Sequence, residues 1–177
     1  ADHYERMALL PSFVQALRDN PKLASLYLGY DDGDFFMVRP LRTQALKDKF
    51  DAPKTAAYQV WTIDRMGESA LTESVQSESV FFDAEMNFLS RRQNLNERYD
   101  PRNRGWYNNA RKQKIYGLEG REGEQITTAP YVFFSTGNVG TTLARSGGDH
   151  AVIAADLTLA DLSATLAKHK ITPSSEV

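Results

Sequence analysis

The feature that most constrains the fold is a turn signal between two short strand-like runs near the N-terminus. Residues 23–30 and 35–38 are rich in aromatic and aliphatic side chains, and the polar segment 31–34 (Asp-Asp-Gly-Asp) separates them. An Asp-Gly step between two such runs is a strong signal for a β-hairpin. The segment lacks the length and the distal glutamate of an EF-hand loop, so a calcium site is not expected.

Strand-like runs recur along the rest of the chain, and helical patterns are few. Further strands are expected over residues 57–66, 70–75, 77–89, 126–135, 140–145 and 151–157. Helices are expected over residues 3–18, with a kink or restart at Pro11, over residues 101–114, and after residue 158, where Asp156 or Thr158 could cap the helix. Runs of strands with few intervening helices predict an α+β fold with an antiparallel sheet and a long N-terminal helix.

Length, charge and composition exclude several classes of protein. The 177 residues suit one domain, and a net charge of −2 with interspersed signs does not indicate nucleic-acid binding. The absence of cysteine excludes disulfides, thiol catalysis and cysteine-based zinc sites. No apolar run approaches the ~20 residues of a membrane span. Because the chain begins with alanine rather than methionine, we expect it to be a piece of a longer protein.

No catalytic motif is present. The histidines are scattered and lack the spacing of a zinc-binding motif, and the chain has neither a nucleophile elbow nor a glycine-rich phosphate loop. Acidic residues are abundant, but nothing in their spacing singles out a catalytic pair. We therefore expect a binding module rather than an enzyme, with no metal and no cofactor.

One stretch, residues 99–107 (Tyr-Asp-Pro-Arg-Asn-Arg-Gly-Trp-Tyr), combines two arginines with three aromatic residues. Asp100 could cap a helix whose first turn contains the following proline. The helix N-terminus and Arg104 would then form a site for a carboxylate or another anion. Trp106 and Tyr107 would supply flat walls for a small amphipathic ligand. The same residues also suit a purely structural cluster, in which an arginine stacks on a core tryptophan.

The spacing of these residues is shared by a known family. The motif Tyr99-x4-Arg104-x-Trp106-Tyr107-x2-Ala110, the tripeptide 129–131 (Ala-Pro-Tyr) and the segment 155–159 (Ala-Asp-Leu-Thr-Leu) resemble Cache domains. These are the PAS-like extracytoplasmic sensor modules of bacterial chemoreceptors, histidine kinases and nucleotide cyclases. The resemblance spans nearly the whole chain and is greatest to the membrane-distal module of a double Cache domain. It implies a sensor module over residues 1–168 and an exit segment over 169–177, where a second module could begin.

The resemblance also implies a ligand site. In amino-acid-binding members, an arginine and a tryptophan hold the ligand carboxylate, while two aspartates and a tyrosine hold the ammonium. The residues at matching positions here are Tyr99, Arg104, Trp106, Tyr107, Tyr131 and Asp156. Phe133 departs from the pattern, because it occupies the position of the first aspartate and removes one negative charge. Tyr131 could instead belong to the core, and Asp156 could be a plain helix cap.

These residues lead to one expected function and one rival. We expect the periplasmic or extracellular part of a membrane-anchored bacterial receptor that binds a small carboxylate-bearing ligand, either an amino acid or an organic acid. The N-terminal helix could form a homodimer. The rival is a ligand-free structural or dimerisation module of such a receptor, with the aromatic cluster packed shut. A ligand site would need a concave space of a few hundred Å³.

Overall fold

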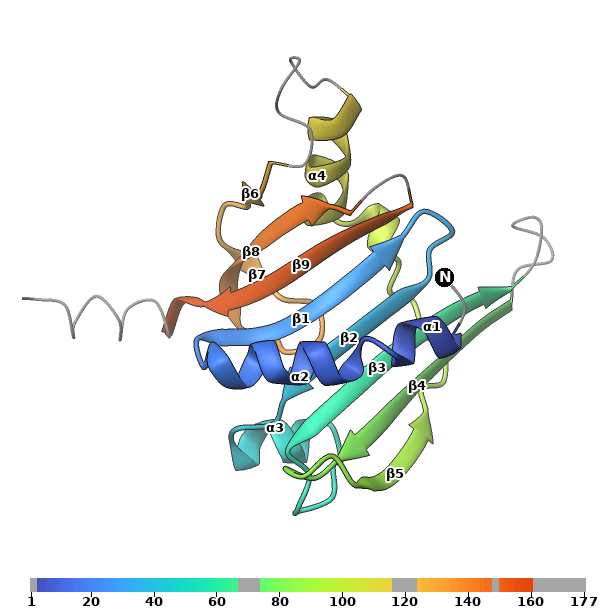
Figure 1. Ribbon diagram of the computed structural model, residues 1–177, viewed down its shortest axis with the longest axis vertical. Coiled ribbons are helices and arrows are strands. Elements are labelled where there is room, and N and C mark those ends of the chain that lie inside the picture. Colours follow the sequence, from blue (N-terminus) through green and yellow to red (C-terminus); the bar gives the residue numbers. More distant parts are fainter. Residues whose placement is uncertain (1–2, 67–73, 116–123, 148–149, 161–177) are drawn as a thin grey trace, which may run out of the picture.

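The framework of the fold is one antiparallel sheet. The computed structural model describes residues 3–66, 74–115, 124–147 and 150–160. Its strands are β1 (Leu23–Tyr30), β2 (Phe35–Pro40), β3 (Tyr58–Met66), β4 (Ser74–Phe82), β5 (Phe88–Gln93), β6 (Ile126–Thr127), β7 (Tyr131–Val132), β8 (Val139–Ser146) and β9 (Ala151–Thr158). They are ordered β5-β4-β3-β2-β1-β9-β8-β6, and β7 also pairs with β8 (Figure 1). The predicted α+β class with a PAS-like antiparallel sheet is confirmed.

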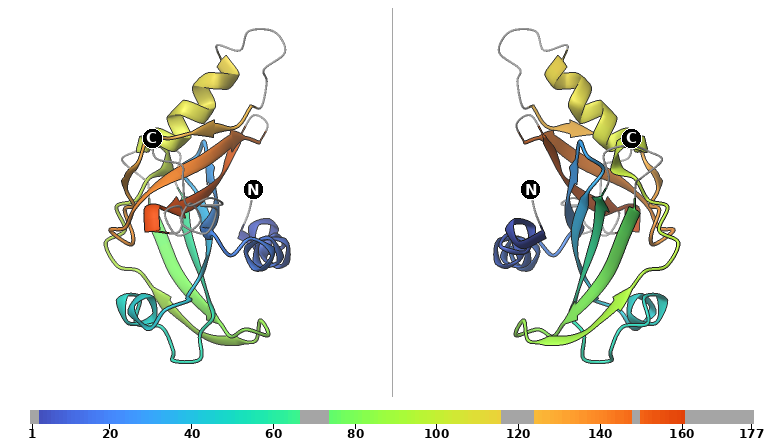
Figure 2. Two further views of the ribbon diagram at one scale, coloured as in Figure 1. Left: turned by 90° about the vertical axis from the view of Figure 1, so that its left-hand side faces the viewer. Right: turned by 90° about the vertical axis from the view of Figure 1, so that its right-hand side faces the viewer.

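Helices lie on both faces of this sheet. They are α1 (His3–Met7), α2 (Leu10–Asp19), α3 (Gln44–Lys49), the short 3₁₀ helix η1 (Pro101–Asn103) and α4 (Gly105–Ile115). Helix α2 lies on one side of the sheet and α3 on the other (Figure 2). None of the helices in the described ranges has the length and apolar character needed to cross a bilayer.

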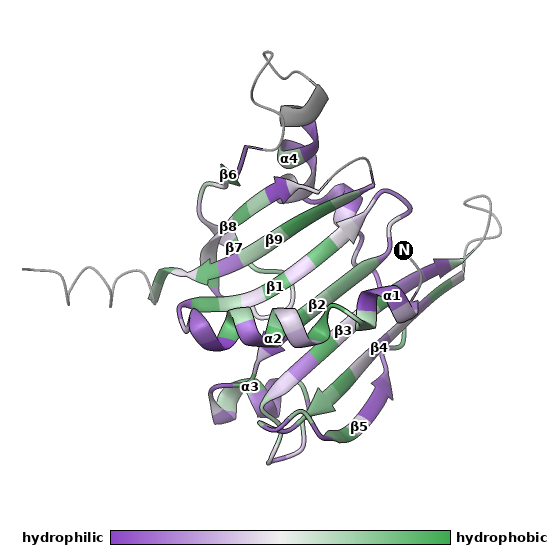
Figure 3. Cartoon of the chain, in the orientation of Figure 1, coloured by the Kyte–Doolittle hydropathy of each residue, from purple (hydrophilic) through white to green (hydrophobic). Residues whose placement is uncertain are grey.

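The alternation of side chains along the strands builds one core on each face of the sheet, and a smaller cluster of Leu41, Ala56 and Phe81 packs against Leu46 of α3. Tyr27, Phe35 and Trp61 belong to the core that also contains Trp106 of α4. The neighbouring residues on the same strands, such as Leu28, belong to the core formed with α2. Figure 3 shows β2 and β9 as mostly hydrophobic, β1 and β3 as mixed, and the edge strand β5 as mostly hydrophilic. The face that carries η1 and α4 is called the α4 face below.

The predicted N-terminal helix restarts next to its proline. Helix α1 ends at Met7, and α2 begins at Leu10 with Pro11 in its first turn, where a missing N–H is tolerated. Arg6 anchors α1 to the sheet: it is 1% exposed, and its guanidinium donates to Asp34 at 2.6 Å and to Asp64. No pattern in the sequence predicted these ion pairs of Arg6.

The structure corrects the predicted helix after the Asp-Pro step. Asp100 accepts a hydrogen bond from the Arg102 N–H and caps η1, not α4. Arg104 has an extended backbone between the two helices, and its carbonyl accepts the N–H of Asn108, so it stands at the start of α4. The single helix predicted over residues 101–114 is therefore two helices with a break at Arg104.

Two predicted strands are also wrong in extent. The predicted run 77–89 contains a turn, because the Asp83 carboxylate accepts the N–H groups of Glu85 and Asn87 and ends β4. The predicted run 126–135 forms only the short strands β6 and β7, and Pro130, which has no N–H to donate, lies between them.

The last predicted helix does not begin at Asp156, which lies inside β9. The alternative reading of Asp156 as a helix cap is therefore wrong. Other predictions fall on residues 67–73, 116–123, 148–149 and 161–177, which are outside the described residues. These include the first part of the predicted strand 70–75, most of the last helix and the exit segment.

Gly29 sets how closely α4 approaches the sheet. A Cβ atom at this position would lie 2.7 Å from Pro101 Cβ and 2.8 Å from a ring carbon of Trp106. We expect Gly29→Ala to destabilise the domain by about 1–3 kcal/mol, because η1 and α4 must move outward. Urea unfolding measures this change. Gly105→Ala is the matched control, since a Cβ there would have no neighbour within 4 Å; equal losses in the two variants would contradict the close-approach argument.

Candidate functional site

Six of the seven predicted site residues surround one small cavity on the α4 face. Its volume is about 20 Å³, and Tyr27, Trp61 and Phe134 complete its aromatic walls. The six residues are Tyr99, Arg104, Trp106, Tyr131, Phe133 and Asp156. A space of this size holds about one water molecule. The structure therefore brings the predicted residues together but leaves little room between them.

Asp156 forms the polar end of this cavity. The register of β9 places it opposite Ser25 of β1 and Thr142 of β8. Its carboxylate accepts hydrogen bonds from Tyr27 Oη at 2.6 Å, Thr142 Oγ1 at 2.6 Å and Ser25 Oγ at 3.1 Å, and Tyr131 Oη lies 2.7 Å from the same threonine hydroxyl. Burial raises the pKa of Asp156 above its ordinary value, and the hydroxyl hydrogen bonds and the charge of Arg39 oppose that rise.

Arg104 forms the cationic side of the cavity. Its guanidinium carbon lies 5.7 Å from the centre of the Tyr99 ring and 5.5 Å from that of Phe134. Tyr99 in turn packs between Phe35 and Trp61, with ring centres 4.7 and 5.1 Å away. Within the described ranges, no carboxylate forms an ion pair with Arg104. This arrangement leaves a cation on an aromatic platform with donors that can bind an anion.

Tyr107 does not line the cavity. Its ring lies beside Gly29 on the sheet, and its hydroxyl is buried without a hydrogen-bond partner among the described residues. Burial raises the pKa of Tyr107. The sequence predicted Tyr107 as a site residue, but the structure gives it contacts with the sheet instead.

Phe133 fills the position where the resemblance implied an aspartate. It is 5% exposed, and its ring packs against Tyr131 with centres 5.3 Å apart. A Cβ atom at Gly140 would lie 2.4 Å from the Phe133 ring, so the glycine provides the space for it. The phenyl group thus supplies an apolar wall and no negative charge.

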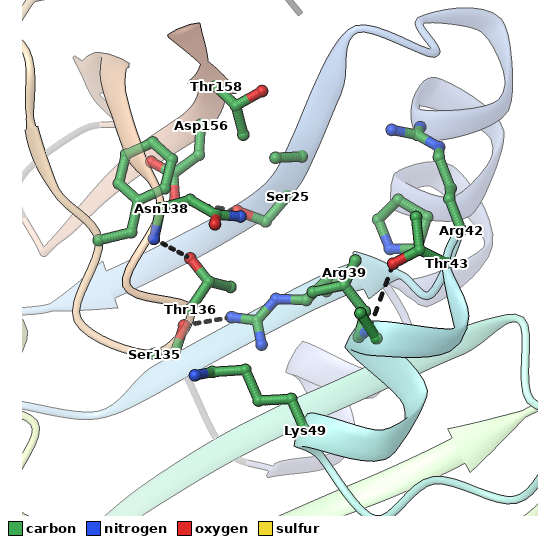
Figure 4. A pocket seen from close by; sticks show the side chains of 15 residues that line it. Ser25, Arg39, Arg42, Thr43, Lys49, Ser135, Thr136, Asn138, Asp156 and Thr158 are labelled. Atoms are coloured by element: carbon green, nitrogen blue, oxygen red, sulfur yellow. Dashed lines mark hydrogen bonds between the residues drawn. The ribbon is translucent and has the colours of Figure 1, made fainter. Parts of the chain in front are cut away.

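A larger cleft adjoins the aromatic cavity. Its volume is about 500 Å³, and Phe133, Ser135 and Asp156 line both spaces. Strand β2, helix α3 and the turn 135–138 form its other walls, as Figure 4 shows. A cleft of this volume can accommodate a small ligand, whereas the aromatic cavity is too small to do so.

The cleft contains a buried cation that sequence reasoning missed. Arg39 of β2 is 4% exposed, and its guanidinium donates to Gln59 Oε1 at 3.2 Å and to Ser135 Oγ at 2.5 Å. It also lies 4.4 Å from the centre of the Phe50 ring. Burial lowers the pKa of Arg39 to about 10, and the nearby charge of Asp156 opposes this shift. Extending the alternation of Phe35 and Met37 by one step would have placed Arg39 on the α4 face.

Comparison with known proteins gives a limited result. No protein family matches the chain. The sequence is similar to Adenylate cyclase 1 of Rhizobium meliloti (strain 1021), with 28% identity over 163 residues, which are 91% of this chain and 23% of that protein. The chain thus spans less than a quarter of this relative. The similarity and the antiparallel sheet are compatible with a sensor domain of a signalling protein.

Metal binding finds no support in the described ranges, where no group of three or more His, Cys, Asp or Glu side chains could hold an ion. The charged side chains of the site can instead bind ionic groups of a ligand. Arg104 and Arg39 can bind anions, Asp156 can bind a cation or accept hydrogen bonds, and the aromatic walls exclude water.

The raised pKa of Asp156 predicts a pH-dependent stability. Its contribution is fully present below the ordinary aspartate pKa of 3.8 and is lost as the pH rises through the higher folded-state value. We expect Asp156→Asn to be more stable than the parent at pH 7, with a difference that disappears toward pH 4. Urea unfolding between pH 4 and 8 measures it. The exposed Asp19→Asn serves as control; an Asp156→Asn variant less stable than the parent at pH 7 would contradict the prediction.

Proposed function

We propose that this chain is a Cache-type sensor module in the extracytoplasmic part of a membrane-anchored bacterial signalling receptor. It binds a small carboxylate-bearing molecule, an amino acid or an organic acid, on the α4 face. The observation that carries this proposal is the meeting of Arg104 and Asp156, residues of opposite charge, at one aromatic-walled cavity beside a cleft of about 500 Å³.

The ligand carboxylate binds Arg104, where a charged hydrogen bond contributes about 1.5–3 kcal/mol. Asp156 and its hydroxyl neighbours receive the other polar end of the ligand. Because the cavity alone is too small, the ligand extends into the cleft, and Phe133 in the shared wall moves to admit it. The module itself has no catalytic role, and any enzymatic activity belongs to the rest of the receptor. The similarity to a protein named as an adenylate cyclase supports a signalling context.

Strand β1 offers a route from the site to the N-terminal helices. Tyr27 donates to Asp156, while the next residue, Leu28, packs in the core that contains α2. A ligand signals only if it favours one of two arrangements by differential affinity. A shift of β1 on binding would change both sides of the sheet at once.

The rival function is a structural or dimerisation module that binds no ligand. The cavity volume of about 20 Å³ favours it, because the predicted site residues already fill most of the space. The two functions differ in whether any small molecule stabilises the domain.

The test is a thermal-shift screen of the purified chain against amino acids, organic acids, amines and purines. A ligand at 100 times its dissociation constant adds about 2.7 kcal/mol, which raises the melting temperature by roughly 5–10 °C for a domain of this size. We expect a carboxylate to give this shift and Arg104→Ala to abolish it without unfolding the domain. Arg98→Ala, an exposed arginine outside the site, should respond like the parent. The proposal would be contradicted if no compound raised the melting temperature, or if the Arg104→Ala variant showed the same shift as the parent.

A further inference from the structure

Arg39 is a buried cation with no carboxylate among its hydrogen-bond partners in the described residues. Its hydrogen-bond acceptors are the Gln59 amide, the Ser135 hydroxyl and the Met37 sulfur, all of them neutral. No carboxylate forms an ion pair with it among the residues that the structure describes. The charge of Asp156 acts on Arg39 without a direct hydrogen bond, and a buried charge that no counter-charge contacts is costly. The site therefore gains most from an anion that enters the cleft.

Lys49 brings a second positive charge to the same place. It lies at the end of α3, which begins at the Thr43 cap on the rim of the cleft. Figure 4 shows its side chain extending alongside Arg39, with the ammonium and the guanidinium directed toward Ser135. No acidic side chain pairs with Lys49 in the described part of the chain. Two like charges that line one cleft repel each other, and an anion bound between them would offset that repulsion.

The charges that line the two adjoining spaces indicate what kind of anion fits. Arg104 lines the cavity, Arg39 and Lys49 line the cleft, and Asp156 lines both. Arg42 also lines the cleft, but its guanidinium donates to the carbonyls of Leu23 and Leu17. The other three cations and the one carboxylate leave two positive charges, which a ligand with two carboxylates would neutralise. Phe133, in the wall between the two spaces, suits an apolar carbon chain that joins two such groups.

We propose that Arg39 and Lys49 form a second anion subsite and that the ligand is a dicarboxylate, with one carboxylate at Arg104 and the other in the cleft. This inference rests on the proposed function and narrows its ligand class. The Ser135 hydroxyl, now an acceptor for Arg39, rotates to donate to the bound carboxylate. The arrangement predicts that the affinity for a ligand depends on its second carboxylate and on the distance between its two carboxylates.

The experiment is isothermal titration calorimetry of the purified chain with malonate, succinate and glutarate, and with butyrate as the monocarboxylate. We expect one of the dicarboxylates to bind at least tenfold more tightly than butyrate. Lys49→Glu should weaken the binding of that dicarboxylate at least tenfold and leave the affinity for butyrate unchanged, because only the second carboxylate lies near the reversed charge. Lys22→Glu, an exposed lysine that lines neither space, makes the same charge change and should bind like the parent.

Arg39→Gln is a second variant, which keeps hydrogen-bond donors but removes the charge. It should lose the preference for two carboxylates, and if it fails to fold, the exposed Lys49→Glu decides the question. Equal binding of mono- and dicarboxylates, or full dicarboxylate affinity in Lys49→Glu, overturns the subsite while an Arg104-dependent carboxylate response preserves the proposed function. Inorganic phosphate that binds in place of dicarboxylates overturns the ligand class. No binding by any carboxylate overturns both proposals.

Discussion

The register of β1 between β2 and β9 is the constraint on which the rest of the structure depends. It places Tyr27 and Gly29 on the α4 face and Leu28 on the α2 face. Gly29 allows Trp106 and η1 to approach the sheet, and Tyr27 meets Asp156 across the β1–β9 pair. A shift of one residue in the pairing of β1 would move its side chains to the opposite faces of the sheet and separate the site residues.

The buried charges among the described residues are compensated in different ways. Arg6 meets two aspartates, so its charge is neutralised and serves to hold α1 against the sheet. Asp156 receives three hydroxyl hydrogen bonds, which favour its charged form without cancelling its charge. Arg39 donates hydrogen bonds to neutral acceptors within the described ranges, and the charge of Asp156 acts on it without a direct contact. The first arrangement is structural, whereas the second and third leave charge available to a ligand, and both of these residues line the same cleft.

Local sequence patterns predicted much of the fold because antiparallel strands and turns are specified by neighbouring residues. The first hairpin follows the Asp-Gly signal, and Pro11 correctly indicated where the N-terminal helix restarts. Two of the errors came from polar side chains whose local contacts cannot be read from periodicity. Asp83 closes a turn inside an apolar run, and Asp100 caps a short 3₁₀ helix in place of a longer α-helix.

The sequence by itself determined the residue types of the candidate site and their approximate elements, since the 99–107 motif and the late strands are local features. Tertiary structure alone decided which of them meet. Ser25 and Asp156 are 131 residues apart in the chain, and only the pairing of β1 with β9 brings their side chains into contact. The small aromatic cavity, the cleft beside it and the burial of Arg39 likewise follow from packing between distant elements, because volume and desolvation depend on neighbours that local patterns do not specify.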